Sequence, residues 1–257
     1  MTSFYYLFRG MTMKSLLLMR RYLFDTAASL LTTYIMFAII FFGGKAVAGQ
    51  AFDDSVGNIV VWLFLFGVVS SAYQSASSQI YQEAQWGTLE HLYISPFKFE
   101  QVLLMKLVVQ MFIGSITSGV VLAAMIVTSG KFFTIDLVTI VPLMVMVLLP
   151  AVGFGMIFAG LALLYKRISS VFRIAQWSMM GLITAPVIEY PVLKALPIST
   201  ASLLMQQAML EGVRFWEFDP TNLAIAVVTT VVYFGIGYTV FGYLRRIAID
   251  RGVLGHY

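Results

Sequence analysis

Long runs without charged residues alternate with short charged segments along this chain. Five of the runs contain no Asp, Glu, Lys or Arg over at least 19 residues: 26–44, 55–82, 107–130, 137–165 and 220–244. A helix needs about 20 apolar residues to cross the hydrocarbon core of a bilayer. Backbone whose N–H and C=O groups lack hydrogen bonds within the protein cannot cross it. The pattern therefore predicts an all-α membrane protein with transmembrane helices at about 26–44, 55–80, 103–128, 137–164 and 220–244.

Another apolar region follows the fourth run and allows more than one interpretation. Between Arg173 and Glu189 only the 15 residues 174–188 are free of charge. A helix of this length is about 22 Å long, which is shorter than the hydrocarbon core of about 30 Å. If the side chain of Arg173 reaches the headgroups, a sixth span over 168–188 becomes long enough. The next apolar run, 195–210, follows a cluster of prolines and fits either a seventh span or a re-entrant hairpin.

The distribution of basic residues favours the hairpin. With the N-terminus in the cytosol and six spans, twelve of the sixteen Lys and Arg residues lie on cytosolic segments, in line with the positive-inside rule. A seventh span would move Arg245, Arg246 and Arg251 to the outside. We therefore expect a multi-pass protein of the cell membrane with both termini in the cytosol, and 187–215 as a re-entrant or interfacial hairpin on the outer side.

Composition supports this class and excludes several others. The 257 residues are 60% hydrophobic and 11% charged, whereas soluble domains have about 45–50% and about 25%. There is no cysteine, and His91 and His256 are the two histidines, so disulfides and thiolate or multi-histidine metal sites are excluded. The net charge of +4 follows from the topology, and we expect no nucleic-acid partner. Because no linker interrupts the chain, 1–257 is expected to be one transmembrane domain.

The N-terminal segment 2–23 mixes basic residues with large apolar ones and has no signal-peptide core. Basic and aromatic side chains together suit the headgroup layer of a membrane. We therefore expect an amphipathic helix that lies in the inner interface and contacts lipid. A plain cytosolic extension of the first span is the alternative.

The second span is apolar in its outer half and rich in Ser, Gln and Tyr in its inner half. Polar side chains that face lipid are unfavourable, so this half is expected to face other helices or water. One interpretation is the lining of a substrate path, with Tyr73, Gln74, Ser77 and Gln79 as candidate residues. Hydrogen-bonded helix packing explains the pattern equally well.

The fourth span contains two features that bear on helix packing. Pro142 and Pro150 predict a kinked or broken helix. Ala151, Gly155 and Ala159 are four residues apart and form a seam of small residues, suited to close packing within one chain or in a dimer. Packing within one chain is the commoner use of such a seam.

Motifs for several common chemistries are missing from the sequence. There is no GxxxxGK[ST] phosphate loop, no HExxH and no GxSxG. No Asp, Glu, Lys, Arg or His lies near the middle of an expected span, where ion-coupled carriers usually keep an ionisable group. If the protein moves a substrate uphill, we expect the energy to come from another subunit. Glu189, at the outer end of the fifth span, is a candidate for an outer gate or a carboxylate at headgroup level.

The longest cytosolic loop predicts a short helix. Gly87 ends the extension of the second span, Thr88 is a good N-cap, and Glu90 suits the first helical turn. Pro96 stops the helix, which therefore covers about 89–95. The i, i+3, i+4 spacing places three apolar side chains on one face: Leu89, Leu92 and Tyr93. Such a face can dock in a groove of a soluble partner, although an ordinary interfacial loop is the alternative.

This loop resembles the cytosolic loop of type-2 ATP-binding-cassette (ABC) transporter permeases. The family pattern is a charged cluster, then Gly-Thr-Leu-Glu, then a leucine and Ser/Thr-Pro. The matching residues are Glu83, Gly87, Thr88, Leu89, Glu90, Leu92, Ser95 and Pro96. Ala84 and Gln85 depart from the charged residues of the family. The layout of the whole chain and the tail 251–255 are also similar to the family.

The resemblance implies an exporter in which two permease chains, identical or related, pair and two separate ATPase subunits bind below them. The helix 89–95, with Tyr93 on its apolar face, would be the coupling helix that passes nucleotide-driven closure to the spans. ATP and Mg²⁺ would bind in the partner subunit, so this chain would hold no cofactor and would not be an enzyme. Exporters of this kind commonly handle drugs, lipids or lipid-linked glycans.

Two other functions stay open. A stand-alone secondary carrier or channel would transport its substrate without an ATPase, although the lack of intramembrane charge disfavours a coupled carrier. An intramembrane enzyme would need Glu90 and His91 to act together. Neighbouring residues on a helix point apart, which argues against such a pair.

Overall fold

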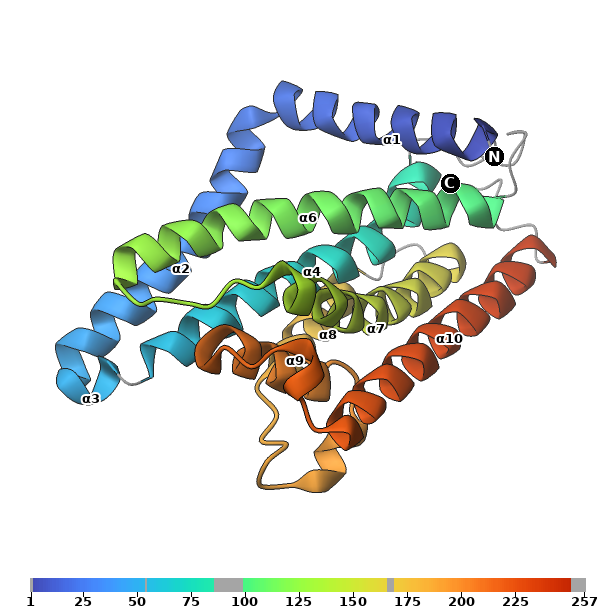
Figure 1. The fold of residues 1–257 in the computed structure, drawn as a ribbon. Coiled ribbons are helices and arrows are strands. Elements are labelled where there is room, and N and C mark those ends of the chain that lie inside the picture. The colour runs from blue at the N-terminus through green and yellow to red at the C-terminus, as the bar shows by residue number, and fades with distance from the viewer. Residues whose placement is uncertain (1, 54, 86–98, 166–168, 251–257) are drawn as a thin grey trace.

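The computed structural model describes residues 2–53, 55–85, 99–165 and 169–250, and these residues form helices and connecting segments without a strand (Figure 1). The α-helices are α1 Thr2–Arg21, α2 Leu23–Ala48, α3 Gln50–Asp53, α4 Val56–Gln85, α6 Phe99–Ser129, α7 Leu137–Leu164, α8 Ser169–Ile183, α9 Ser199–Gln206 and α10 Pro220–Asp250. Short 3₁₀ turns, η1 Pro191–Ala195 and η3 Phe215–Glu217, and one π-helical turn, η2 Gln207–Glu211, complete the fold.

Within the described residues, five helices are long and apolar enough to cross a membrane: Leu23–Val47, Val56–Ser78, Gln101–Ser129, Leu137–Leu164 and Pro220–Asp250. They coincide with five of the six spans predicted from the charge-free runs. The chain is therefore a multi-pass helical membrane protein. The segment 2–23 forms a helix as expected, with α1 meeting α2 at Tyr22.

The sixth predicted span, 168–188, is shorter than expected. Its helix α8 has 15 residues, which is about 22 Å and short of the roughly 30 Å hydrocarbon core. The helix ends at Ile183, close before Pro186, and a proline disfavours helical backbone in the residue that precedes it. The expectation of six full-length spans is therefore wrong for this helix.

The helices alternate in direction, so the bundle has two distinct ends (Figure 1). The start of α1, the end of α4, the start of α6 and the end of α10 lie at one end, which we name the terminal end. The connection 130–136 and α9 lie at the opposite end, which we name the hairpin end. The beginning of α1 and the end of α10 therefore share one side, as the predicted topology requires.

The centre of the fold is α7, which packs between α4 and α10. A Cβ atom added to Gly155 of α7 would lie 2.5 Å from the Cβ of Ala76 on α4. A Cβ atom on Gly237 of α10 would collide with the backbone of Gly153. Glycine is required where two helix backbones approach this closely. The small-residue seam around Gly155 thus packs within the chain.

The helix α7 runs unbroken from Leu137 to Leu164, so of the two expectations at its prolines the break is wrong and the kink stays a prediction. Pro150 has no N–H group, which leaves the carbonyl of Met146 without its helical partner. The hydroxyl of Thr230 on α10 lies 3.0 Å from that carbonyl and 2.7 Å from the carbonyl of Ala226 in its own helix. Its proton can be shared between the two acceptors, and the neighbouring helix thereby supports the proline turn.

The segment predicted as an outer hairpin, 187–215, is folded against the bundle and contains α9. The hydroxyl of Ser199 donates to the carbonyl of Leu182 at 2.9 Å, and that of Ser202 donates to the carbonyl of Ile183 at 3.0 Å. The last carbonyls of a helix lack partners within it. The two serines of α9 therefore complete the end of α8 and hold the two elements together.

The connection before α7 is tied to the same segment. Asp136 caps α7 by accepting from the N–H of Val138 at 3.2 Å and from the hydroxyl of Thr139 at 2.7 Å. The hydrogen bond from Thr139, more than any other contact, lowers the pKa of Asp136. The Thr139 hydroxyl in turn accepts from the N–H of Phe215 at 3.0 Å. One capping group thus joins α7 to the segment between α9 and α10.

Candidate functional site: two cavities beside α4

The polar half of α4 lines a large cavity, which we name the inner cavity. Its volume is about 970 Å³, and its walls come from α1, α2, α4, α6 and α8. Five polar residues of α4 face it: Ser70, Ser71, Gln74, Ser75 and Ser78. The other uncharged polar lining residues are Ser15 of α1, Ser29, Thr32 and Thr33 of α2, Gln110, Thr117 and Ser118 of α6, and Gln176 of α8. A transmembrane helix therefore presents its hydroxyls and amides to a hollow rather than to lipid.

The hydroxyls of this lining are mostly oriented by their own helices. Ser75 donates to the carbonyl of Ser71 at 2.7 Å, and Ser78 donates to that of Gln74 at 2.6 Å. Their oxygen lone pairs remain able to accept from a ligand or water in the cavity. Ser70 differs, because its buried hydroxyl has no hydrogen-bond partner among the described residues.

Four charged residues line the inner cavity. They are Lys14 of α1, Asp25 of α2, Lys106 of α6 and Arg173 of α8, so each comes from a different helix. Asp25, Lys106 and Arg173 lie within the first eight residues of their helices, and the rest of the described lining is uncharged. Basic residues near helix ends suit the interface of a membrane.

The four residues proposed from the sequence as a substrate path do not share one face. Gln74 is exposed and lines the inner cavity. Tyr73 and Ser77 are each 1% exposed and pack toward α7 instead, and the Tyr73 hydroxyl donates to the carbonyl of Phe172 at 3.1 Å. Gln79 belongs to α4, but its side chain lies outside the described residues. Tyr73 and Ser77 thus pack between helices, and a role of Gln74 in a substrate path stays a prediction.

The residues proposed to contact an ATPase fall outside the described part of the chain. Glu83 belongs to the last turns of α4, without a described side chain. The remaining residues lie within 86–98: Gly87, Thr88, Leu89, Glu90, Leu92, Tyr93, Ser95 and Pro96. The helices before and after this segment, α4 and α6, have their near ends at the terminal end of the bundle (Figure 1). The coupling helix stays a prediction.

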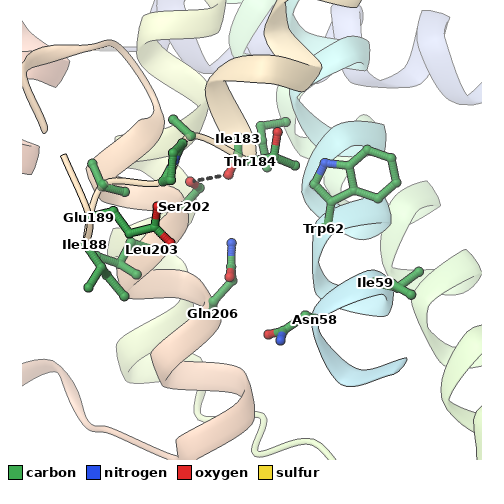
Figure 2. Close-up of a pocket in the computed structure, with 13 residues that line it drawn as sticks. Asn58, Ile59, Trp62, Ile183, Thr184, Ile188, Glu189, Ser202, Leu203 and Gln206 are labelled. Atoms are coloured by element: carbon green, nitrogen blue, oxygen red, sulfur yellow. Dashed lines mark hydrogen bonds between the residues drawn. The ribbon is translucent and has the colours of Figure 1, made fainter. Parts of the chain in front are cut away.

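A second hollow, which we name the outer pocket, lies at the hairpin end (Figure 2). Its volume is about 550 Å³, and it is lined by α4, by the connection after α8 and by α9. Asn58 of α4 and Gln206 of α9 extend their amides toward the open centre, and Trp62 lies one turn along α4 from Asn58 (Figure 2). Glu189 lines the pocket and is exposed, which leaves both interpretations of this carboxylate open.

Sequence reasoning named one residue of this second site, Glu189, as a candidate outer gate and missed the rest. The other polar residues come from α4, from the connection after α8 and from α9. Asn58 was a usable signal, because an amide inside a spanning helix rarely faces lipid. Within the described residues, no group of three Asp, Glu or His side chains could hold a metal ion.

Comparisons of the chain with protein-family models, with curated proteins and with solved structures find no match. Fold and cavity geometry therefore carry the functional argument, together with the loop motif.

Proposed function

We propose that this chain is the transmembrane permease subunit of an ATP-driven ABC exporter. The observation that carries the proposal is the polar inner cavity beside α4, the helix whose end at the terminal end of the bundle precedes the Gly-Thr-Leu-Glu motif. A substrate vestibule and the coupling segment of an ATPase-driven permease need to adjoin in this way. The proposal includes both termini in the cytosol and movement of substrate outward.

The charge distribution supports an external energy source. The charged residues that line the inner cavity lie on α1 and near the starts of α2, α6 and α8, and the residues of α4 that line it are uncharged. Carriers driven by protons or sodium keep an ionisable group at membrane depth. ATP hydrolysis in a separate subunit can drive transport without an ionisable group at membrane depth. ATP and Mg²⁺ would bind in that subunit.

The length of α4 supports a mechanical link. This single helix runs from Val56 to Gln85, about 45 Å, and lines the outer pocket near its start and the inner cavity near its end. Its last residues adjoin the proposed coupling segment. A push on that segment by a partner would therefore move the wall of both hollows together, which is how closure of ATPase subunits would act on a substrate.

The experiment tests whether the segment 86–98 couples to an ATPase. The full chain is purified from its own membrane in mild detergent, and ATP hydrolysis is measured in the co-purified complex. Leu92→Glu and Tyr93→Glu are expected to abolish co-purification of ATPase activity, because a charge disrupts an apolar docking face. Val192→Glu and Tyr190→Glu introduce the same charge at exposed positions of the hairpin end. These two control variants are expected to keep the co-purified ATPase activity.

Two results would contradict the proposal. One is full, coupled ATPase activity in both loop variants, which would remove the docking role of Leu92 and Tyr93. The other is substrate uptake by proteoliposomes that hold this chain alone, which would favour the stand-alone carrier or channel.

A further inference from the structure

One row of residues on α4 connects the outer pocket to the inner cavity. Its members are four residues apart: Asn58, Trp62, Phe66, Ser70, Gln74 and Ser78. The first two line the outer pocket, and the other four line the inner cavity. Side chains at i and i+4 are neighbours along a helix, and this row covers about 30 Å, the thickness of a hydrocarbon core. Each step of four residues turns the row by about 40°, so from Asn58 to Ser78 it winds by about 200° around α4. The two hollows meet on α4 between Trp62 and Phe66.

The row is polar at both ends and aromatic where the two hollows meet. The rings of Trp62 and Phe66 are stacked, with centroids 6.2 Å apart and an interplanar angle of 19°. Phe66 also stacks on Trp177 of α8, with centroids 5.9 Å apart and an angle of 30°. Trp62 lines the outer pocket, whereas Phe66 and Trp177 line the inner cavity. The three rings thus stand between the two hollows.

Two polar groups without partners flank the central ring. The indole N–H of Trp62 and the hydroxyl of Ser70 are covered from solvent and have no hydrogen-bond partner among the described residues. They lie one turn before and one turn after Phe66 on α4. Unpaired buried polar groups are unfavourable in a closed protein. A molecule passing between the hollows would meet an unused donor on one side of Phe66 and an unused hydroxyl on the other.

We infer that Trp62, Phe66 and Trp177 form the closed gate of a path that runs along α4. This inference builds on the proposed function, because it takes the two hollows as parts of a transport path. The gate spans two helices, α4 and α8, so it opens when α8 moves relative to α4 and separates Trp177 from Phe66. Such a movement would break the hydrogen bond from the Tyr73 hydroxyl to the carbonyl of Phe172 on α8.

The chain offers a direct test because it has no cysteine of its own. Gln74→Cys places a reporter in the inner cavity, and the full-length variant is reconstituted into proteoliposomes. A membrane-impermeant maleimide is added, and Phe132→Cys, a position 99% exposed in the 130–136 connection, identifies molecules whose hairpin end faces the reagent. With the stack intact, labelling of Gln74→Cys from the hairpin end is expected to stay at background.

Removing one ring is expected to open the path. In Gln74→Cys combined with Trp177→Ala, labelling from the hairpin end rises to the rate seen from the terminal end. Trp177 is largely exposed, so its truncation leaves the buried core in place. The matched control is Phe154→Ala, which removes a ring stacked on Tyr233 at 6.2 Å between α7 and α10, away from both hollows. That control is expected to stay at background.

Several outcomes would overturn the gate. Labelling of Gln74→Cys from the hairpin end with all three rings present would show an open path or no barrier. Equal labelling in the Trp177→Ala and Phe154→Ala variants would assign the barrier elsewhere. Phe66→Leu provides a second opening variant if Trp177→Ala does not elute as a folded protein. The readout needs no ATPase, so it stands apart from the coupling test, and either can fail without the other.

Discussion

The two sides of α4 contrast in how a membrane helix accommodates polar residues. Toward α7 the contact is tight, with Tyr73 and Ser77 nearly fully buried and a glycine of α7 touching the α4 backbone. Toward α2, α6 and α8 the contact opens into the inner cavity, where Gln74 is exposed. Residues adjacent in sequence, Tyr73 and Gln74, therefore serve packing on one side and the cavity on the other.

The contrast indicates a division of labour within one chain. The helices α4, α7 and α10 meet backbone against backbone at Gly153, Gly155 and Gly237, and we name them the packed half. The helices α2, α6 and α8 surround the hollow and form the cavity half, joined to α4 at Gly114 and by the Tyr73 hydrogen bond to Phe172. A transport path needs walls that move against a fixed frame. Changes in the packed half are therefore expected to affect stability, and changes in the cavity half to affect what enters the cavity.

The largest effect is expected where α7 meets α4. Gly155→Ala would place a Cβ atom 2.5 Å from the Cβ of Ala76 and 2.7 Å from the carbonyl oxygen of Tyr73. Backbone cannot retreat as a flexible side chain can, so we expect destabilisation at the upper end of about 1–3 kcal/mol. Thermal unfolding of the purified chain in detergent measures it.

Gly119→Ala on α6 is the matched control, because a Cβ atom there meets nothing within 4 Å. Alanine in a helix interior is more favourable than glycine by about 0.5–1 kcal/mol, so this variant is expected to be neutral or slightly more stable. Equal unfolding temperatures for the two variants would remove the distinction between the halves.

A smaller loss is expected at the proline turn of α7. Thr230→Val keeps the shape of the side chain but removes the hydroxyl that lies 3.0 Å from the Met146 carbonyl. The carbonyl freed by Pro150 then has no donor, and we expect a loss of about 1 kcal/mol. Thr239→Val on the exposed side of α10 removes a hydroxyl that serves its own helix and is the control in the same unfolding assay. A loss as large at Thr239 as at Thr230 would contradict the account.

Much of the fold could be predicted from charge alone. Long charge-free runs located five spanning helices, because a charged side chain in lipid is too unfavourable to be placed there by chance. The length of α8 could not be predicted in this way, since its end depends on the turn before Pro186 and on the serines of α9 that cap it. The backbone path of the segment 187–215 could not be predicted either, because Ile198 adopts a φ of 71°, which β-branched residues rarely do.

The candidate site was predictable only in part, for a geometric reason. The density of Ser and Gln identified the inner half of α4, yet the sequence could not assign each residue to the packed or the hollow side. That assignment depends on the direction from which α7 and α6 approach, and small residues set it: Gly155 against Ala76, and Gly114 against Ser71. The outer pocket as a whole could not be predicted, because the three segments that line it lie far from one another in the sequence.

The smallest effect expected has the opposite sign and tests the hollow side. Ser70 is 9% exposed, and its hydroxyl has no partner among the described residues. Replacing such a hydroxyl by Ala removes an unpaired polar group, so Ser70→Ala is expected to raise stability by up to about 1 kcal/mol. Ser202→Ala, which breaks a 3.0 Å hydrogen bond to the Ile183 carbonyl, should instead lower the unfolding temperature. If both serines lower it, Ser70 has a partner in the closed protein and is no longer a free group poised for a passing ligand.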